Sequence, residues 1–381
     1  MMKELNLDEI REKIDRIDAQ MAKLFEERMN AVHEVAEYKK ANKLPVRDKA
    51  REAIVLDNCK KRVQNSAYAD GLRKIMAQII DFSCRQEEAF LQNELTKPAV
   101  ARPLTGRVTV GYQGVPGAYS HLALQKYFAG SKVEENHYPL FEDVAQAVKD
   151  GEIMYGLLPI ENSSTGGITE VYDLVRRYNC YIVGEKCVKI EHNLLAYPGT
   201  SLEKITEVYS HPQGFAQCRP FFKQYPKMAQ IPYYNTAKGA ELVSSKKTDY
   251  MAAVAGKQAA ELYGLEILAS NINANTNNYT RFFVIANEPQ DIPGADKITI
   301  IVSLKHEPGS LYHMLGNFYH NGLNMLSIES RPIEGTPWEY FFHIDVSGNL
   351  HDANVKKALE EVSEASTYCK VLGNYVGDKI Q

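Results

Sequence analysis

Several features that define other protein classes are scarce in this 381-residue sequence. None of its six cysteines forms a CxxC pair, which disfavours a disulfide framework or a zinc site and fits the reducing cytoplasm. No apolar run approaches the ~20 residues of a membrane span, and the charged N-terminus is unlike a signal peptide. The formal net charge of −4 gives no electrostatic support for nucleic-acid binding.

Proline and glycine are nearly absent from residues 1 to 95, where Pro45 and Gly71 are the only examples. Because both residues interrupt helices, we predict an all-helical region with one long, one short and one medium helix. Proline-containing linkers follow at 96–106 and at 287–296. The chain is therefore expected to form three domains, at 1–95, 106–286 and 297–381.

A heptad pattern runs through the first predicted helix. Its seam consists of Leu7, Ile10, Ile14, Ile17, Met21, Leu24, Arg28, Ala31, Val35 and Tyr38. Such spacing is typical of a long helix packed against other helices. A buried guanidinium is costly without a partner, so Arg28 must meet a carboxylate, water or an anionic ligand. Lys39 lies about three turns further on the same face, whereas Arg11 is roughly 25 Å away and could serve this pocket only from a second, antiparallel copy.

Further polar residues follow at helical spacing. Asp48, Arg51 and Glu52 share one face, and Ser83 and Glu87 are four residues apart. Spacing alone fits a helical dimerisation module with intrahelical ion pairs. It equally fits a pocket for a small dianion that carries a hydroxyl group.

Residues 107 to about 286 alternate short β-branched runs with helical stretches, which predicts α/β layers with ligands at strand ends. The glycines of GYQGVPGAYSH (111–121) miss the spacing of a dinucleotide site. LLPIENSSTGGITE (157–170) ends a buried strand at a polar helix start, which suits either an anion or a simple helix cap. VYSHPQGFAQC (208–218) repeats this pattern, and NNYTRFFVI (277–285) places a threonine and an arginine in a hydrophobic strand.

Residues 297 to 381 are predicted to form strand, helix, strand, strand, helix and strand, in the order of a ferredoxin-like α+β fold. EPGSLYHML (307–315) covers a helix start, and IESRP (328–332) lies in a strand. By itself this region could be an ordinary dimerisation subdomain.

The helical region resembles the all-helical chorismate mutases, which form intertwined dimers. The similar segments are IREK at 10–13, EER at 26–28, the lysine at 39 and PVRDKARE at 45–52. The resemblance implies that Arg28 and Arg11 of the partner subunit hold the two carboxylates of chorismate. Lys39 and Glu87 would face the ether oxygen of the breaking bond, which gains negative charge in the rearrangement.

The same resemblance implies roles for four more residues. Glu52, with the Asp48 region, would hold the ring hydroxyl, while Arg51 and Ser83 would support the ring carboxylate. Some members carry glutamine where this chain has Glu87. Because a glutamate donates a hydrogen bond only when protonated, mutase activity is expected to fall as the pH rises.

The middle region resembles prephenate dehydratase in GYQGVPGAYSH, PIENSSTGG, SHPQGFAQC and NNYTRFF. That family has two α/β lobes with a cleft between them, like a periplasmic binding protein. The resemblance implies that Thr280 supplies the catalytic hydroxyl, with Arg281 and Phe282 beside it; His211 is an alternative proton source. The residues implied around the cleft are Glu161, Asn162, Ser163, Thr165, His211 and Gln213. No metal ion and no cofactor is expected.

The last region resembles the ACT regulatory domain of phenylalanine-sensitive dehydratases, which bind phenylalanine between two copies. The implied effector residues are Gly309, Ser310, Leu311, Tyr312, Asn324, Glu329, Ser330, Arg331 and Pro332. Together the resemblances imply a cytoplasmic homodimer or larger oligomer that converts chorismate through prephenate to phenylpyruvate under feedback inhibition, without nucleic-acid or membrane partners. The alternative is a non-enzymatic amino-acid sensor with a helical dimerisation arm.

Overall fold

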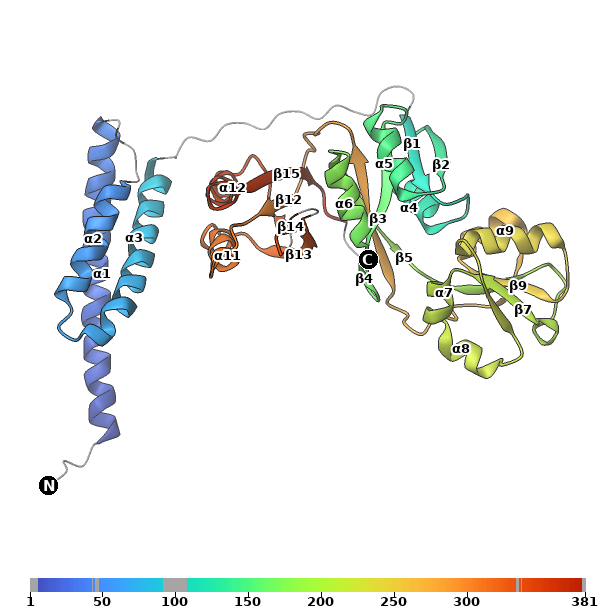
Figure 1. Cartoon of the computed structure of the whole chain (residues 1–381), viewed down its shortest axis with the longest axis horizontal. Helices are drawn as coiled ribbons and strands as arrows, with labels where there is room; N and C mark the ends of the chain where they lie inside the picture. The colour runs from blue at the N-terminus through green and yellow to red at the C-terminus, as the bar shows by residue number, and fades with distance from the viewer. Residues whose placement is uncertain are drawn as a thin grey trace. The chain divides into compact units, whose positions relative to one another are not determined.

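The computed structural model describes residues 6–42, 44, 48–91, 108–333, 336 and 338–378. The chain divides into two compact units, one up to residue 97 and one from residue 98 onward (Figure 1). The linker expected at 96–106 lies outside the described residues. Among the described helices, none is both long and apolar enough to cross a membrane.

Helices make up the first unit, as the sequence predicts. They are α1 (Leu7–Asn42), α2 (Lys49–Arg62), the 3-10 turn η1 (Ser66–Tyr68) and α3 (Ala69–Leu91). Helix α3 packs against both α1 and α2. Helix α1 buries Val32 and Ala36, and its Phe25 ring lies 5.8 Å from the ring of Phe82.

Most of the predicted heptad seam of α1 does not pack within the chain, and Arg28, which contacts Ser83 of α3, is the exception. Its exposed apolar side chains are Leu7, Ile10, Ile14, Ile17, Met21, Leu24, Val35 and Tyr38. The buried residues Val32 and Ala36 lie next to the seam in sequence and belong to a neighbouring face of the helix. A long apolar stripe of α1 therefore remains exposed in the single chain.

The second unit begins with lobe 1, an α/β sheet in the order β2-β1-β3-β11-β5, with β4 added beside β3. The strands are β1 (Val108–Gln113), β2 (Val133–Tyr138), β3 (Tyr155–Asn162), β4 (Gly166–Gly167), β5 (Tyr181–Lys189) and β11 (Tyr279–Ala286). The helices are α4 (Tyr119–Tyr127), α5 (Phe141–Lys149) and α6 (Thr169–Arg177).

Lobe 2 has a second sheet in the order β10-β6-β9-β7-β8. Its strands are β6 (Asn193–Ala196), β7 (Glu207–Ser210), β8 (Ala229–Pro232), β9 (Met251–Ala255) and β10 (Glu266–Ala269). Its helices are η2 (Leu202–Lys204), α7 (Pro212–Gln217), α8 (Arg219–Gln224), α9 (Thr236–Lys246) and α10 (Lys257–Tyr263). The chain crosses from β5 to β6 and returns from β10 to β11, so two connections join the lobes (Figure 1). This is the two-lobed, binding-protein-like arrangement that was expected.

The C-terminal part is a four-stranded antiparallel sheet in the order β13-β14-β12-β15, as a ferredoxin-like fold requires. Its elements are β12 (Lys297–Ser303), α11 (Ser310–His320), β13 (Met325–Pro332), β14 (Tyr340–Ser347), α12 (Ala353–Ala365) and β15 (Tyr368–Tyr375). The two helices share a hydrophobic core with the sheet. Ile301, Leu372 and Tyr375 instead join the core of lobe 1, so this sheet packs directly on the dehydratase-like part.

Candidate active and effector sites

Three of the residues proposed for the mutase site lie around one turn of α3. The guanidinium of Arg28 on α1 donates a hydrogen bond to the buried hydroxyl of Ser83, which in turn donates to the carbonyl of Ile79. The next residue, Cys84, lies 4.0 Å from a carboxylate oxygen of Glu52 on α2. A guanidinium has five N–H donors, so the contact with Ser83 leaves Arg28 able to bind an anion.

The other proposed mutase residues are distributed along the unit. Lys39 is half-buried near the end of α1, Asp48 caps α2 by accepting a hydrogen bond from the Arg51 N–H at 3.0 Å, and the Arg51 side chain is exposed. The backbone of Glu87 lies in α3, but its side chain lies outside the described residues. Because α1 is a single helix, Arg11 stays roughly 25 Å from Arg28; it pairs with Asp8 at 3.5 Å.

The junction of the two lobes brings Asn162 and Thr280 together. The two residues pair across β3 and β11, and both are buried. The Nδ2 of Asn162 donates to the Thr280 hydroxyl at 2.9 Å and to the Asn278 amide oxygen at 2.7 Å. Because the Thr280 oxygen accepts this bond, its own hydrogen can be donated to a ligand.

The turn after β3 connects this pair to lobe 2. Thr165 donates to the amide oxygen of Asn162 at 3.2 Å and accepts from Gln213 of α7 at 3.0 Å, a hydrogen bond between the lobes. Ser163 accepts from the N–H of Tyr279 at 2.9 Å. His211 caps α7, its Nδ1 accepting from the Gln213 N–H at 3.2 Å, and burial lowers its pKa. An imidazole with a lowered pKa is mostly neutral near pH 7, so it is a poor source of protons.

Three further residues proposed for the lobe junction are held by other contacts. The Arg281 guanidinium contacts the carboxylates of Glu161 at 3.0 Å, Glu185 at 3.2 Å and Asp345 at 2.6 Å. Phe282 is only 2% exposed and belongs to the hydrophobic core of lobe 1. Successive side chains of a strand point to opposite faces, so Glu161 and Arg281 point away from Asn162 and Thr280. In the single chain these three side chains are engaged in other contacts, and their proposed place at the substrate stays a prediction.

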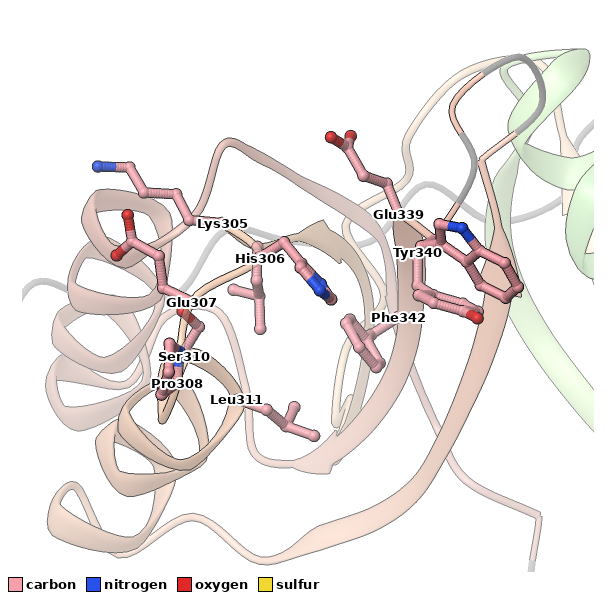
Figure 2. Close-up of a pocket in the computed structure, with 11 residues that line it drawn as sticks. Lys305, His306, Glu307, Pro308, Ser310, Leu311, Glu339, Tyr340 and Phe342 are labelled. Carbon is pink, nitrogen blue, oxygen red and sulfur yellow. The ribbon is translucent and has the colours of Figure 1, made fainter.

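A pocket of about 390 Å³ opens beside the start of α11. Figure 2 shows His306, Leu311 and Phe342 pointing toward one another from a loop, a helix and a strand. Ser310 and Leu311 were expected here; the sequence interpretation missed the aromatic residues His306, Trp338, Tyr340 and Phe342. The sequence does contain a signal for three of them: Trp338, Tyr340 and Phe342 are spaced two apart, a spacing that predicts one face of a strand.

The remaining effector candidates divide between the two faces of β13. Ser330 and Pro332 are exposed and pair with Phe342 and Tyr340, so they lie on the pocket's side of the sheet. Glu329 and Arg331 alternate with them and face lobe 1, where Arg331 binds Asp173 of α6 at 2.6 Å.

The last three effector candidates lie near these elements. Gly309 starts α11 with φ of +87°, a conformation that glycine adopts without strain. The exposed Tyr312 stacks edge-on against His313, and the backbone of Asn324 pairs with Ser347. Neither of these two side chains lines the pocket.

Comparisons with known proteins match this arrangement region by region. Family models match for chorismate mutase type II at 10–88, prephenate dehydratase at 110–290 and the ACT domain at 298–364. The bifunctional chorismate mutase/prephenate dehydratase of Escherichia coli (strain K12) is 35% identical, covering 97% of this chain and 96% of that protein. The enzyme of the same description from Aquifex aeolicus (strain VF5) is 32% identical, with 97% of each chain covered.

Two solved structures resemble the second unit, each covering 71% of this chain. The prephenate dehydratase of Arthrobacter aurescens, in complex with L-Phe, has 31% identity and a TM-score of 0.65 over 90% of its length. GqqA, described as a novel type of quorum quenching acylase, has 32% identity and a TM-score of 0.65 over 98% of its length.

The fold and the matched domains define a multidomain enzyme in which a helical mutase domain precedes a two-lobed dehydratase domain and an ACT domain. The two relatives are matched over 96% and 97% of their own lengths, so the match extends across all three domains. The chain belongs to the family of bifunctional chorismate mutase/prephenate dehydratases.

Proposed function

We propose that this chain rearranges chorismate to prephenate in its helical unit and converts prephenate to phenylpyruvate at the lobe junction, with phenylalanine as feedback inhibitor. The observation that carries the proposal is the buried hydrogen bond from Asn162 to Thr280, 2.9 Å long, beside a hydrogen bond between the lobes. It presents one oriented hydroxyl group at a strand end between two lobes.

The dehydration step suits a hydroxyl donor. The carboxylate–ring bond breaks, its electron pair enters the ring, carbon dioxide leaves, and the ring C–O bond breaks as the ring becomes aromatic. The departing hydroxide is stabilised by a hydrogen bond and leaves as water with a proton that comes from the solvent, so a hydrogen-bond donor aimed at that oxygen lowers the barrier. Thr280 has its hydrogen available because Asn162 occupies its acceptor side. We assign the donor role to Thr280, because the lowered pKa of His211 leaves little imidazolium near neutral pH.

The mutase step needs no nucleophile and no proton transfer. It needs a compact conformer of chorismate and donors aimed at the ether oxygen as the C–O bond breaks. Arg28, Ser83 and Glu52 supply a cation, a hydroxyl and a carboxylate around one turn of α3. We propose that Lys39 and Glu87 complete the ether-oxygen side, and that Asp48 and Arg51 lie at the ring side.

We further propose that the enzyme is a homodimer or larger, with two α1 helices packed antiparallel. The exposed seam of α1 supplies the apolar surface, and Leu24, for example, is 62% exposed in the single chain. An antiparallel second copy would bring Arg11 of the partner subunit toward Arg28. None of the six cysteines, all of which lie among the described residues, forms a disulfide, and on this basis we place the enzyme in the cytoplasm.

The effector site is proposed at the α11 pocket and the adjoining face of β13. The pocket combines aromatic walls from β14 with the helix start at Ser310, and Ser330 and Pro332 border it on the neighbouring strand. A 390 Å³ pocket has room for one amino acid, and aromatic walls suit an apolar ring. Phenylalanine would be shared between two copies across the exposed edge strand β13.

The test is a coupled assay of wild type, Arg28→Ala and Thr280→Ala. Wild type should consume chorismate and yield phenylpyruvate. Thr280→Ala should lower dehydratase turnover by about 10²–10⁴-fold and keep mutase turnover. Arg28→Ala should lose the mutase step yet still convert added prephenate. A wild-type protein that turns over neither substrate would leave the amino-acid sensor as the better account.

A further inference from the structure

A cluster of charged side chains joins the ACT sheet to the strand that carries Thr280. This ion cluster consists of Arg281, Lys297, Glu161, Glu185 and Asp345. Arg281 contacts all three carboxylates, as described above. Lys297 contacts two of them, Glu185 at 2.8 Å and Asp345 at 3.6 Å. The Arg281 side chain is 12% exposed and that of Asp345 4% exposed, so water screens this contact little.

Asp345 is held on the ACT side by more than charge. Its second carboxylate oxygen accepts a hydrogen bond from the Thr299 hydroxyl at 2.7 Å, and that hydroxyl lies 2.8 Å from the phenol oxygen of Tyr375. Burial alone would raise the pKa of Asp345, but the charges of Arg281 and Lys297 lower it below its usual range. Asp345 is therefore ionised and fixed in the middle of the ACT sheet.

A second contact reaches the same strand pair from the C-terminal end. Asp378 accepts hydrogen bonds from the N–H of Cys187 at 2.8 Å and from Lys186 at 3.1 Å. Cys187 is the residue that pairs with Arg281 across β5 and β11. Asp345 of the ACT sheet thus holds Arg281 on β11, and Asp378 holds Cys187 on β5. These two residues form the cross-strand pair next to Thr280.

We propose that Asp345 is a positioning residue for the dehydratase reaction: by holding Arg281 it fixes Thr280, and it transmits effector binding to that strand. Asp345 lies on β14, which pairs with β13 along one edge, and Ser327 of β13 lies opposite Asp345. The proposed effector residues Ser330 and Pro332 follow Ser327 on the same strand. A displacement of β13 by a bound ligand therefore reaches Asp345 through one pair of neighbouring strands. This inference rests on the dehydratase function proposed above.

The charge balance makes Asp345→Asn a usable variant. The ion cluster holds two cations and three carboxylates, a formal charge of −1, and the substitution leaves two of each. The matched control is Lys370→Met. Lys370 also joins the ACT sheet to lobe 1, through Asn179 at 2.5 Å and the Tyr181 ring at 4.3 Å, but Tyr181 pairs with Ala286 at the far end of β11.

The measurements are dehydratase kcat and KM with added prephenate, and the phenylalanine concentration that halves the rate. Asp345→Asn is expected to lower kcat about 10-fold with KM nearly unchanged, because a small displacement of a reacting group costs rate more than binding. It should also raise the half-inhibiting phenylalanine concentration about 10-fold, a typical allosteric coupling. Lys370→Met should match wild type in both, and mutase turnover should be unaffected in both variants.

A double variant separates positioning from general loosening. If Arg281 and Asp345 act through one contact, Arg281→Met combined with Asp345→Asn should lose no more kcat than the worse single variant. Should Asp345→Asn unfold, Thr299→Val removes one hydrogen bond to Asp345 and keeps every charge; it should shift both quantities in the same direction, by less.

Unchanged kcat and unchanged phenylalanine response in a folded Asp345→Asn protein, or in Thr299→Val where that substitute is needed, would overturn the inference. So would equal effects in Lys370→Met, because the loss would then follow from any weakened domain contact. Either result leaves the proposed dehydratase standing, because wild type would still convert prephenate. A wild type without that activity would refute the proposed function itself.

Discussion

Active-site complementation tests whether the mutase pocket is built from two chains. Arg11→Ala and Arg28→Ala should each abolish mutase turnover when they are the only chain present. Within one α1 helix the two residues are 17 positions apart, roughly 25 Å along the axis, which is too far to grip one small molecule. If Arg11 serves the partner's site, a mixed dimer holds one pocket with both arginines and one pocket with neither.

The expected recovery follows from that symmetry. Free exchange of equal amounts makes about half of the dimers mixed, and one of the two pockets in each is intact, so about a quarter of wild-type mutase turnover should return. The assay is chorismate consumption by the co-expressed, differently tagged chains, normalised to dehydratase turnover with added prephenate. Both substitutions lie in the first unit and Thr280 lies in the second, so the dehydratase rate is expected to report the amount of active chain.

Leu24→Glu supplies the control for the helix interface. Burying one leucine side chain contributes ~1.5–3 kcal/mol, and a twofold interface buries two, so the loss is about 3–6 kcal/mol, or 10²–10⁴-fold in the dimer dissociation constant. Adding Leu24→Glu to both chains should therefore remove the recovered activity and shift sedimentation toward the monomer. Mixed dimers that form but remain inactive would refute the shared pocket, as would a fully active monomer.

Three further perturbations test the structure of the second unit. Burial lowers the pKa of His343 from 6.5 to about 4, so the unfolded chain binds a proton that the folded chain does not, and stability is lost as the pH falls from about 6.5 to 4. The loss is about 2 kcal/mol at pH 5, and thermal unfolding of His343→Leu should not show it. Gly373→Ala should lower the unfolding temperature of the second unit by several degrees, because an added Cβ would collide with the backbone carbonyl of Ile182. Phenylalanine should change the fluorescence of Trp338, the only tryptophan, which lines the proposed effector pocket.

Each of these has a result that would contradict it. Parallel pH–stability curves for wild type and His343→Leu would show that His343 titrates normally. A Gly373→Ala protein as stable as wild type would mean that β15 and β5 can separate at no cost. Saturating phenylalanine that inhibits the dehydratase without altering Trp338 emission would move the effector site away from the α11 pocket.

Local patterns in the sequence predicted most of the helices and strands and their order. Helix and strand order follow from periodicity and from proline and glycine positions, and the ferredoxin-like order was correct strand by strand. Thr280 and Asn162 were both named through the resemblance of NNYTRFF and PIENSSTGG to prephenate dehydratase, whereas the polar turns by themselves left an anion site and a helix cap open. Period-two alternation could also have separated Arg281 from Thr280, since neighbours on a strand face opposite sides.

The sequence by itself determined the order of the domains, the apolar seam of α1 and the chemistry available at each strand end, because these depend on residues close together in the chain. Only the tertiary structure decided what occupies the opposite face of β11, where Asp345 lies 64 residues from Arg281. It likewise decided that Arg331 binds Asp173 and that Trp338 lines a pocket with His306. Such contacts depend on how distant segments pack, and no local pattern encodes the partner of a buried charge.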